Sequence, residues 1–363
     1  MTIKAGLVGL PNVGKSTLFN ALTRSQVPAE NYPFCTIDPH LAITNVPDTR
    51  LNELCRIYSS QKIIAATMSF VDIAGLVKGA SQGAGLGNQF LSNIREVDLV
   101  LHVVRCFGED TVDPLDDFDT IISELIIKDL ESIEKRQAKL LGSIKASQNK
   151  PAEKKVIEAE QEMLKNVTLA LNTQDTETAQ KIFNSFKTET TQLISTKKFL
   201  VAANFAENDF VEDAYLTNPH YKTLVAKFGQ ERIIPVCART EYELTLLEET
   251  QVEEMMEMLG MKTKGLEIII RKAYDALDMI TFFTVGPQEA HAWPIKKGIT
   301  IRAAAGEIHS DLERGFICSE ICNYVDVKEA GSEAALKKTG KMRTEGQDYL
   351  VQDGDIINVR FNV

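Results

Sequence analysis

The segment that decides the fold is GLPNVGKST, residues 9–17, which follows the apolar run AGLVGL (5–10) and precedes the helix-like LFNALT (18–23). It fits the pattern G-x-x-x-x-G-K-[ST] in the strand-to-helix setting that the pattern requires. Its glycines allow backbone N–H groups to curl around phosphate oxygens, and the start of the helix adds a partial positive charge. The segment therefore predicts a nucleotide-phosphate site at the end of a strand in an α/β sheet.

Three segments contribute to this phosphate site. We expect Lys15 to neutralise phosphate oxygens and Ser16 to ligate Mg²⁺. In SFVDIAG, Asp72 is expected to hold Mg²⁺ through a water, while the Gly75 N–H contacts the γ-phosphate. Thr36, in the proline-flanked NYPFCTIDP, is expected to complete the metal shell with its hydroxyl. The residues expected to line the phosphates are Asn12, Val13, Gly14, Lys15, Ser16 and Thr17.

Composition limits the classes of function that the chain can have. It has 363 residues, of which 44% are hydrophobic and 25% charged, as is typical of a soluble multidomain protein. A formal net charge of −11 argues against a broad basic surface that grips nucleic acid, so any nucleic-acid contact must be local and no DNA partner is expected. The six cysteines show no CxxC spacing, and no segment has the apolar length needed to cross a bilayer. We therefore expect reduced thiols, no membrane partner and a cytoplasmic location.

Short apolar runs alternate with helical stretches in the first part of the chain. This alternation predicts a doubly wound α/β sheet of parallel strands, with ligands at the carboxyl ends of the strands. The expected strands are 5–10, 68–74, 97–107, 197–204 and 232–238. Between the third and fourth of these runs, apolar residues at helical spacing predict an antiparallel helical pair inserted at 115–192. Two ordinary sheet-covering helices are the alternative.

The sequence changes character near residue 280. The helical run GLEIIIRKAYDALDM (265–279) closes a nucleotide-binding domain of residues 1–279. Beyond it, TFFTVG, AHAWPI, DYLVQDGD and IINVRFNV have the pattern of short strands separated by Asp-Gly and Lys-Lys-Gly turns. We therefore expect a small α+β domain at 280–363.

The stretch KKFLVAANFAEND (197–209) is where the base should be read. A guanine-reading loop would carry Asn-Lys-x-Asp, but here Asn204 is followed by Phe205 and then by Glu207, whose carboxylate reaches one methylene further. Adenine suits the Asn204 side chain and an apolar ring cover, so ATP is the first choice and GTP the second. The Cys237-Ala238 backbone is expected to pack against the base. The alternative is that Asn204 and Glu207 cap the following helix.

The ordered set GLPNVGKST, the Thr36 loop, DIAGLVKGA and N-x-x-E, with the C-terminal stretch 329–363, resembles one family over nearly the whole chain. It is similar to the Obg-like ATPases of the YchF subfamily, within the TRAFAC class of P-loop nucleotide hydrolases. The resemblance implies a Ras-like core, a coiled-coil-type insertion and a C-terminal TGS domain of the ubiquitin-like β-grasp kind. It also implies slow, Mg²⁺-dependent ATP hydrolysis and association with the ribosome or another translation-related ribonucleoprotein.

The group that activates water is not evident in this chain. Related GTPases place a Gln after the D-x-x-G glycine where this chain has Leu76, and the loop 107–117 is short and lacks the histidine of some relatives. His102 lies in an apolar run and is expected to be a packed residue. Lys15 and the Gly75 N–H are therefore left as catalytic groups, and turnover should be slow. Asn12 is a further candidate, since its carbonyl can help to coordinate K⁺ beside the phosphates; the alternative is that it only braces the loop.

Two classes of function use these same residues. One is an ATP hydrolase whose cycle reshapes the glycine-rich loop, and the other is a nucleotide-occupied binding module whose turnover is incidental. A GTPase of the same architecture is a further alternative. A local positive cluster of Lys337, Lys338, Lys341 and Arg343 is either solvated surface or, given the resemblance, part of the surface that binds the ribosome.

Overall fold

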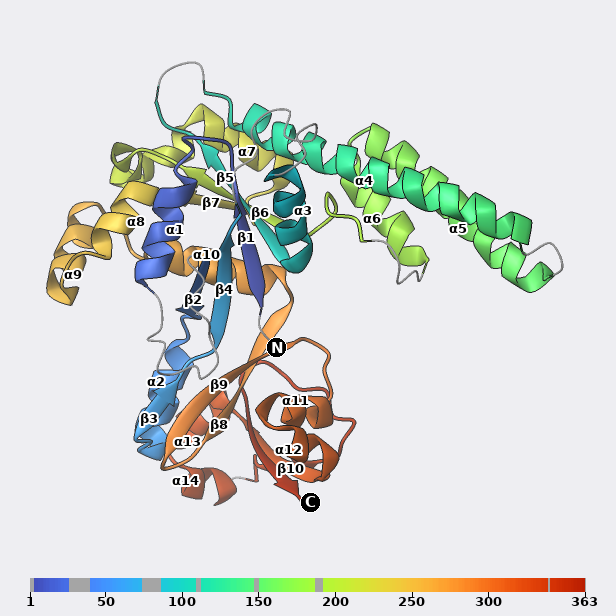
Figure 1. Ribbon diagram of the computed structural model, residues 1–363. Coiled ribbons are helices and arrows are strands. Elements are labelled where there is room, and N and C mark those ends of the chain that lie inside the picture. The colour runs from blue at the N-terminus through green and yellow to red at the C-terminus, as the bar shows by residue number, and fades with distance from the viewer. Residues whose placement is uncertain are drawn as a thin grey trace. The chain divides into compact units, whose positions relative to one another are not determined.

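The computed structural model describes residues 3–25, 40–73, 86–108, 112–146, 150–186, 192–338 and 340–362 (Figure 1). The chain forms two compact units. One unit comprises Met1–Ala5, Phe19–Phe70 and Glu243–Val363. The other comprises Gly6–Leu18 and Val71–Tyr242. None of the described helices combines the length and the apolar composition that a bilayer crossing needs.

The first sheet has six strands in the order β2-β4-β1-β5-β6-β7. These strands are β1 (Lys4–Val8), β2 (Leu41–Asn45), β4 (Thr67–Asp72), β5 (Leu99–Arg105), β6 (Phe199–Asn204) and β7 (Ile233–Val236). β5 pairs with β6 in parallel, and β6 pairs in parallel with β7. The five apolar runs that predicted strands here are confirmed, because a strand covered on both faces needs an almost continuous apolar sequence. β2 lacks such a run and was not predicted.

Helices follow most of these strands. They are α1 (Lys15–Arg24), α2 (Thr49–Tyr58), α3 (Leu86–Glu96), α7 (Pro219–Phe228), α8 (Ala238–Leu244), α9 (Glu249–Met258), α10 (Gly265–Ala276) and the 3₁₀ segment η3 (Glu207–Thr217). Asn218 caps α7 through a hydrogen bond from the His220 N–H to its side-chain oxygen, at 2.9 Å, and Pro219 occupies the first helical position. The alternation of strand and helix is that of an α/β nucleotide-binding domain, as predicted.

The helical insertion consists of α4 (Pro114–Ala146), α5 (Pro151–Asn172) and α6 (Thr176–Ser185). Figure 1 shows α4 and α5 lying side by side, and the two helices are in contact. The guanidinium of Arg136 binds both carboxylate oxygens of Glu160 across the pair, at 2.8 and 3.1 Å. The alternative of two ordinary sheet-covering helices is thereby excluded, while α6 is a third helix that the periodicity did not predict.

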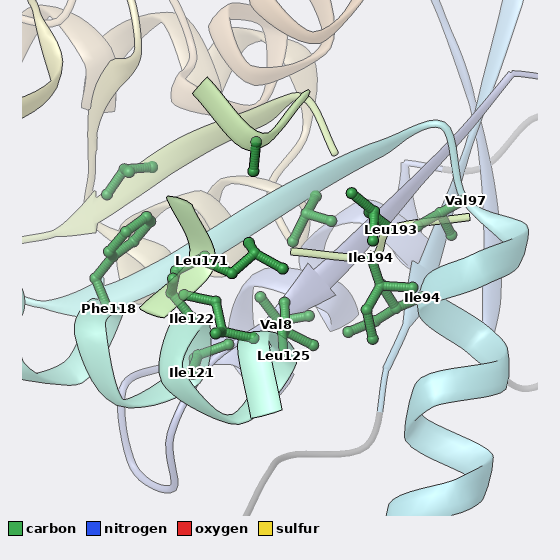
Figure 2. Packing of buried hydrophobic residues seen from close by; sticks show 14 of the residues in the cluster. Val8, Ile94, Val97, Phe118, Ile121, Ile122, Leu125, Leu171, Leu193 and Ile194 are labelled. Carbon is green, nitrogen blue, oxygen red and sulfur yellow. The ribbon is translucent and has the colours of Figure 1, made fainter. Parts of the chain in front are cut away.

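One hydrophobic cluster joins this insertion to the first sheet (Figure 2). Ile121, Ile122 and Leu125 of α4 lie with Leu193 and Ile194, which precede β6. Each fully buried aliphatic side chain of this kind contributes about 1.5–3 kcal/mol. A buried carboxylate adds a polar connection at the same place.

That carboxylate belongs to Asp129 of α4, which is 2% exposed. It accepts hydrogen bonds from the Ile194 N–H at 3.0 Å, the Ser195 N–H at 2.8 Å and the Ser195 hydroxyl at 2.6 Å. Burial raises the pKa of Asp129, although these three donors act in the opposite direction. The turn that leads into β6 is therefore fixed to α4.

The second sheet also has six strands, in the order β11-β10-β12-β8-β9-β3. They are β3 (Lys62–Ile64), β8 (Met279–Val285), β9 (Glu289–Lys296), β10 (Phe316–Asn323), β11 (Arg343–Glu345) and β12 (Asp355–Phe361). The helices of this region are α11 (Ile301–Ile308), α12 (Ser310–Arg314), α13 (Tyr324–Ala330) and α14 (Glu333–Lys338). The mixed α+β fold expected after residue 280 is therefore confirmed, although its sheet also takes in β3 and the expected strand at 348–355 is wrong. That stretch contains turns and one isolated bridge, between Leu350 and Thr300.

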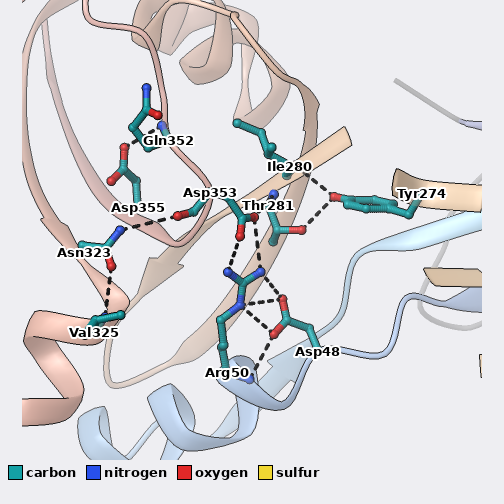
Figure 3. A network of polar contacts seen from close by, with 10 residues as sticks. All are labelled: Asp48, Arg50, Tyr274, Ile280, Thr281, Asn323, Val325, Gln352, Asp353 and Asp355. Atoms are coloured by element: carbon teal, nitrogen blue, oxygen red, sulfur yellow. Dashed lines mark hydrogen bonds and ion pairs between the residues drawn. The ribbon is translucent and has the colours of Figure 1, made fainter. Parts of the chain in front are cut away.

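Strand β3 comes from the early part of the chain and pairs in parallel with β9, with Ile64 opposite His291. The helix before it, α2, is fixed to the same sheet by polar contacts (Figure 3). Arg50 pairs with Asp48 at 2.7 Å and with Asp353 at 2.6 Å. Asp353 also accepts a hydrogen bond from the Thr281 N–H at 2.9 Å. These carboxylates raise the pKa of Arg50 against the opposing effect of its burial.

Candidate nucleotide site

The phosphate loop connects β1 to α1 through two residues with positive φ, Asn12 at 64° and Gly14 at 94°. A Cβ added to Gly9 would lie 2.8 Å from the Val103 carbonyl oxygen. A Cβ on Gly14 would collide with the Asn204 side-chain amide. Neighbouring groups of the protein therefore leave no room for a side chain at either glycine, in addition to the need for the backbone to approach a phosphate closely.

Lys15, the first residue of α1, forms an ion pair with Asp72, the last residue of β4. The two side chains are 10% and 17% exposed. The Ile73 N–H donates to the Leu7 carbonyl at 3.2 Å, which aligns the end of β4 with the end of β1. The fold thus brings together Lys15, which the sequence assigned to phosphate, and Asp72, which the sequence assigned to Mg²⁺.

The remaining phosphate residues lie around this pair. Val13 is buried at 2%, while Asn12 and Ser16 are exposed. Gly14 and Thr17 are partly exposed. Thr36, Gly75 and Leu76 lie outside the described residues.

Asn204, the last residue of β6, joins the phosphate loop to the segment after β7. Its Nδ2 donates to the Val13 carbonyl oxygen and its Oδ1 accepts from the Ala238 N–H, both at 2.9 Å. The side chain is 4% exposed. Its amide is therefore engaged with the protein on both sides, whereas the sequence assigned it to the adenine edge.

Neither Asn204 nor Glu207 caps the segment that follows them. The carboxylate of Asp209 does so by accepting a hydrogen bond from the Ala206 N–H at 3.1 Å. Asn204 instead engages the first N–H of α8, which has no partner within that helix. The capping alternative considered for these two residues is therefore wrong for the segment that starts at Glu207.

Phe205 differs from the expected apolar cover of the base. Its side chain is 1% exposed and its ring lies 6.2 Å from that of Tyr215 and 6.4 Å from that of Tyr221. Burying a phenylalanine ring among aromatic neighbours is more favourable than leaving one face in water, so Phe205 belongs to the core. Phe205, which stands where a guanine-reading motif has lysine, therefore packs in the core in this structure.

Glu207 begins η3 and is partly exposed. The Thr240 hydroxyl lies 3.4 Å from Glu207 Oε2 and 3.1 Å from the Cys237 sulfur. Cys237 and Ala238 are 6% and 1% exposed. These residues therefore form one cluster at the carboxyl ends of β6 and β7. Thr240 was not among the predicted site residues, and its only signal in the sequence was a hydroxyl residue shortly after the Cys-Ala pair.

His102 of β5 is a packed residue, as predicted. It is 1% exposed, and its ring lies 4.5 Å from that of Phe118. Burial lowers the pKa of His102 to about 3, so the imidazole is neutral in the folded protein. Among the residues that the structure describes, no group of three His, Cys, Asp or Glu side chains has the arrangement of a metal site. The five described cysteines are free thiols.

A strand, a phosphate loop and a helix, with a lysine facing a carboxylate at the end of a neighbouring strand, define the P-loop class of nucleotide-binding proteins. Comparison with known proteins agrees with this class. The sequence profile described as a 50S ribosome-binding GTPase matches residues 4–139. A profile for the C-terminal domain of YchF GTPases, described as a protein of unknown function, matches residues 279–362.

Full-length relatives narrow the class further. The chain is 42% identical over 372 residues, covering 100% of both sequences, to a Bacillus subtilis protein named ribosome-binding ATPase YchF. An Escherichia coli O157:H7 protein of the same name is 42% identical over 376 residues, again with 100% coverage of both. A solved structure of the Schizosaccharomyces pombe YchF GTPase superposes with a TM-score of 0.85 and 36% identity, covering 99% of this chain and 98% of that one. The chain belongs to the YchF family.

Proposed function

We propose that this protein binds Mg-ATP, hydrolyses it slowly to ADP and phosphate, and associates with ribosomes through a nucleotide-dependent switch. The observation that carries the proposal is the convergence of Lys15 and Asp72 beside the phosphate loop, with Asn204 tying that loop to the segment after β7. The relatives named ribosome-binding ATPases support both the reaction and the partner. By the same family relation, the protein is an Obg-like member of the TRAFAC class with a C-terminal TGS domain, and it acts in the cytoplasm.

Each residue near the loop has a role in this proposal. Lys15 neutralises phosphate oxygens, and the phosphate-loop N–H groups hold them in place. Ser16, at the end of the loop, and Asp72, through a water, would supply the oxygen donors that Mg²⁺ prefers, and the Thr36 hydroxyl is proposed to complete the metal shell. The Gly75 N–H is proposed to contact the γ-phosphate. When bound, Mg²⁺ would offset the charge on the β- and γ-phosphates.

ATP is proposed as the substrate, with GTP as the second candidate. The names of relatives include both ATPase and GTPase, so the base preference has to be measured on this chain. Calorimetric titration with Mg-ATP and Mg-GTP decides it. We expect ATP to bind more tightly, and equal or tighter GTP binding would refute the adenine assignment.

Hydrolysis is tested with Lys15→Ala. We expect this variant to remain folded, because Lys15 pairs with Asp72 at the carboxyl end of β4 rather than packing in the core. ATP hydrolysis should be lost. Lys154→Ala, on α5, changes a lysine whose side chain is 43% exposed; it is the matched control and should keep the wild-type rate. An active Lys15→Ala protein would contradict the phosphate assignment.

Asn12 is proposed to help to coordinate K⁺ beside the phosphates. The residue is exposed, and its positive φ places it at the turn of the loop. We expect wild-type hydrolysis to be faster in K⁺ than in Na⁺ at equal ionic strength. The difference should vanish in Asn12→Ala. Equal wild-type rates in the two salts would eliminate a role for K⁺.

The ribosome contact is proposed to include the positive cluster Lys337, Lys338, Lys341 and Arg343. Within this cluster Lys341 is already paired with Asp326 at 2.7 Å and with Glu329 at 3.0 Å. Neutralising all four residues should weaken ribosome co-sedimentation and reduce its salt dependence. Lys341→Ala alone should have a small effect because its charge is matched locally. Unchanged sedimentation of the fourfold variant would show that the cluster is ordinary surface.

A further inference from the structure

The Thr240 hydroxyl lies inside the protein, in the first turn of α8. The residue is 1% exposed, so this hydroxyl has to find its acceptor within the protein. Two acceptors are within reach, the Cys237 sulfur at 3.1 Å and Glu207 Oε2 at 3.4 Å. A carboxylate oxygen accepts a hydrogen bond more strongly than a thiol sulfur does. Thr240 is therefore placed to hold one oxygen of Glu207.

The position of Thr240 is fixed relative to the phosphate loop. Asn204 accepts from the N–H of Ala238, at the start of α8, and donates to Val13 of the loop. Thr240 lies two residues further along α8, so its hydroxyl is held by the same short helix. The carboxylate of Glu207 is thus positioned relative to the phosphate loop through a continuous set of contacts.

We propose that Thr240 determines the choice of purine by holding Glu207 Oε2 and leaving Oε1 as the oxygen presented to the base. Guanine offers an N1–H and an N2 amino group side by side, and a carboxylate reads this pair with both oxygens. The adenine N6 amino group needs a single acceptor. Holding one oxygen toward α8 therefore weakens the bidentate reading of guanine and leaves the reading of adenine in place. This inference rests on the proposed adenine-nucleotide function.

The test is the ratio of GTP to ATP dissociation constants, measured by calorimetry on the full chain with Mg²⁺ present. Thr240→Val removes the hydroxyl and keeps the shape of the side chain. We expect the preference for ATP to fall about tenfold, which corresponds to about 1.4 kcal/mol. Thr240→Ser keeps a hydroxyl and should keep the preference. Thr223→Val, which changes an exposed threonine of α7, is the matched control and should leave the ratio unchanged.

Thermal unfolding of each variant shows whether the buried substitution is tolerated, and Thr240→Ala replaces Thr240→Val if the latter does not fold. A preference for ATP that survives removal of the hydroxyl, in whichever of these two variants folds, overturns the role of Thr240 and leaves the proposed function intact. Wild-type protein that binds GTP as tightly as ATP overturns the proposed function itself. The two failures are therefore distinguishable in one set of titrations.

Discussion

Replacing Asn204 with alanine should loosen the phosphate loop and α8 together. The side chain is 4% exposed and makes two hydrogen bonds of 2.9 Å, to the Val13 carbonyl and from the Ala238 N–H. Both partners belong to buried residues, 2% and 1% exposed, so the truncation leaves two buried backbone groups unpaired. Each such group costs about 1–3 kcal/mol, which makes the expected loss of stability about 2–6 kcal/mol.

Hydrogen exchange measures this loss locally, which matters because a chain with two compact units need not unfold in one step. The Ala238 amide is expected to exchange at least about 30-fold faster in Asn204→Ala, as a loss of about 2 kcal/mol requires. Calorimetry should show weaker ATP binding as well, because the loop loses its attachment at Val13. The exposed Asn358→Ala, on β12, is the control and should change neither quantity.

Two results would refute this reasoning. Unchanged exchange at Ala238 would mean that its N–H has another acceptor in solution. Unchanged ATP affinity together with faster exchange would mean that the phosphate loop holds its conformation without Asn204.

Three further predictions follow from other contacts. The free energy of unfolding should decrease as the pH falls from about 6.5 toward 3, because His102 stays neutral in the folded protein but takes up a proton when the chain unfolds. The slope from this residue is at most about 1.4 kcal/mol per pH unit. Urea denaturation at several pH values should show a flatter dependence of stability on pH in His102→Phe than in the wild type. Asp353→Ala should destabilise the second sheet by about 1–3 kcal/mol by removing the acceptor for the Thr281 N–H and for Arg50, as read by thermal unfolding, whereas Asp353→Asn should lose less; equal losses would contradict this account. Trp293, the single tryptophan, stacks on the imidazole of His291, with 3.7 Å between the ring centroids, so its fluorescence should fall as His291 is protonated. The midpoint should lie below pH 6.5 because burial lowers the pKa of His291. A pH response that persists in His291→Gln would refute the assignment of the response to this histidine.

The parts of the fold that the sequence predicted correctly depend on local chemistry. The phosphate loop requires glycines, a lysine and a hydroxyl residue at fixed spacing between a strand and a helix, so GLPNVGKST and its immediate neighbours are enough to identify it. Buried parallel strands require apolar runs, and the inserted helices require a 3.6-residue repeat. The boundaries proposed at 279/280 and at 115–192 remain predictions.

The parts that the sequence did not predict depend on contacts between distant segments. The direction of the Asn204 amide is decided by Val13 and Ala238, which no spacing near residue 204 reveals. An apolar residue at position 205 could either cover a base or pack in the core, and the residue type does not distinguish the two. The contacts of Phe205 with Tyr215 and Tyr221 place it in the core. Thr240 acquires its role only because Glu207 lies across from it.

Strand β3 has a consequence for how the protein is made. Ile64 pairs opposite His291, more than two hundred positions later in the chain. At typical rates of synthesis, this early strand waits roughly ten to forty seconds for its neighbour to leave the ribosome. During that interval its backbone groups have no neighbouring strand to pair with, and exposed strand edges of this kind favour misassociation. A nascent chain stalled before residue 289 should therefore be a preferred substrate for chaperones, and it should lose that preference once β9 has emerged.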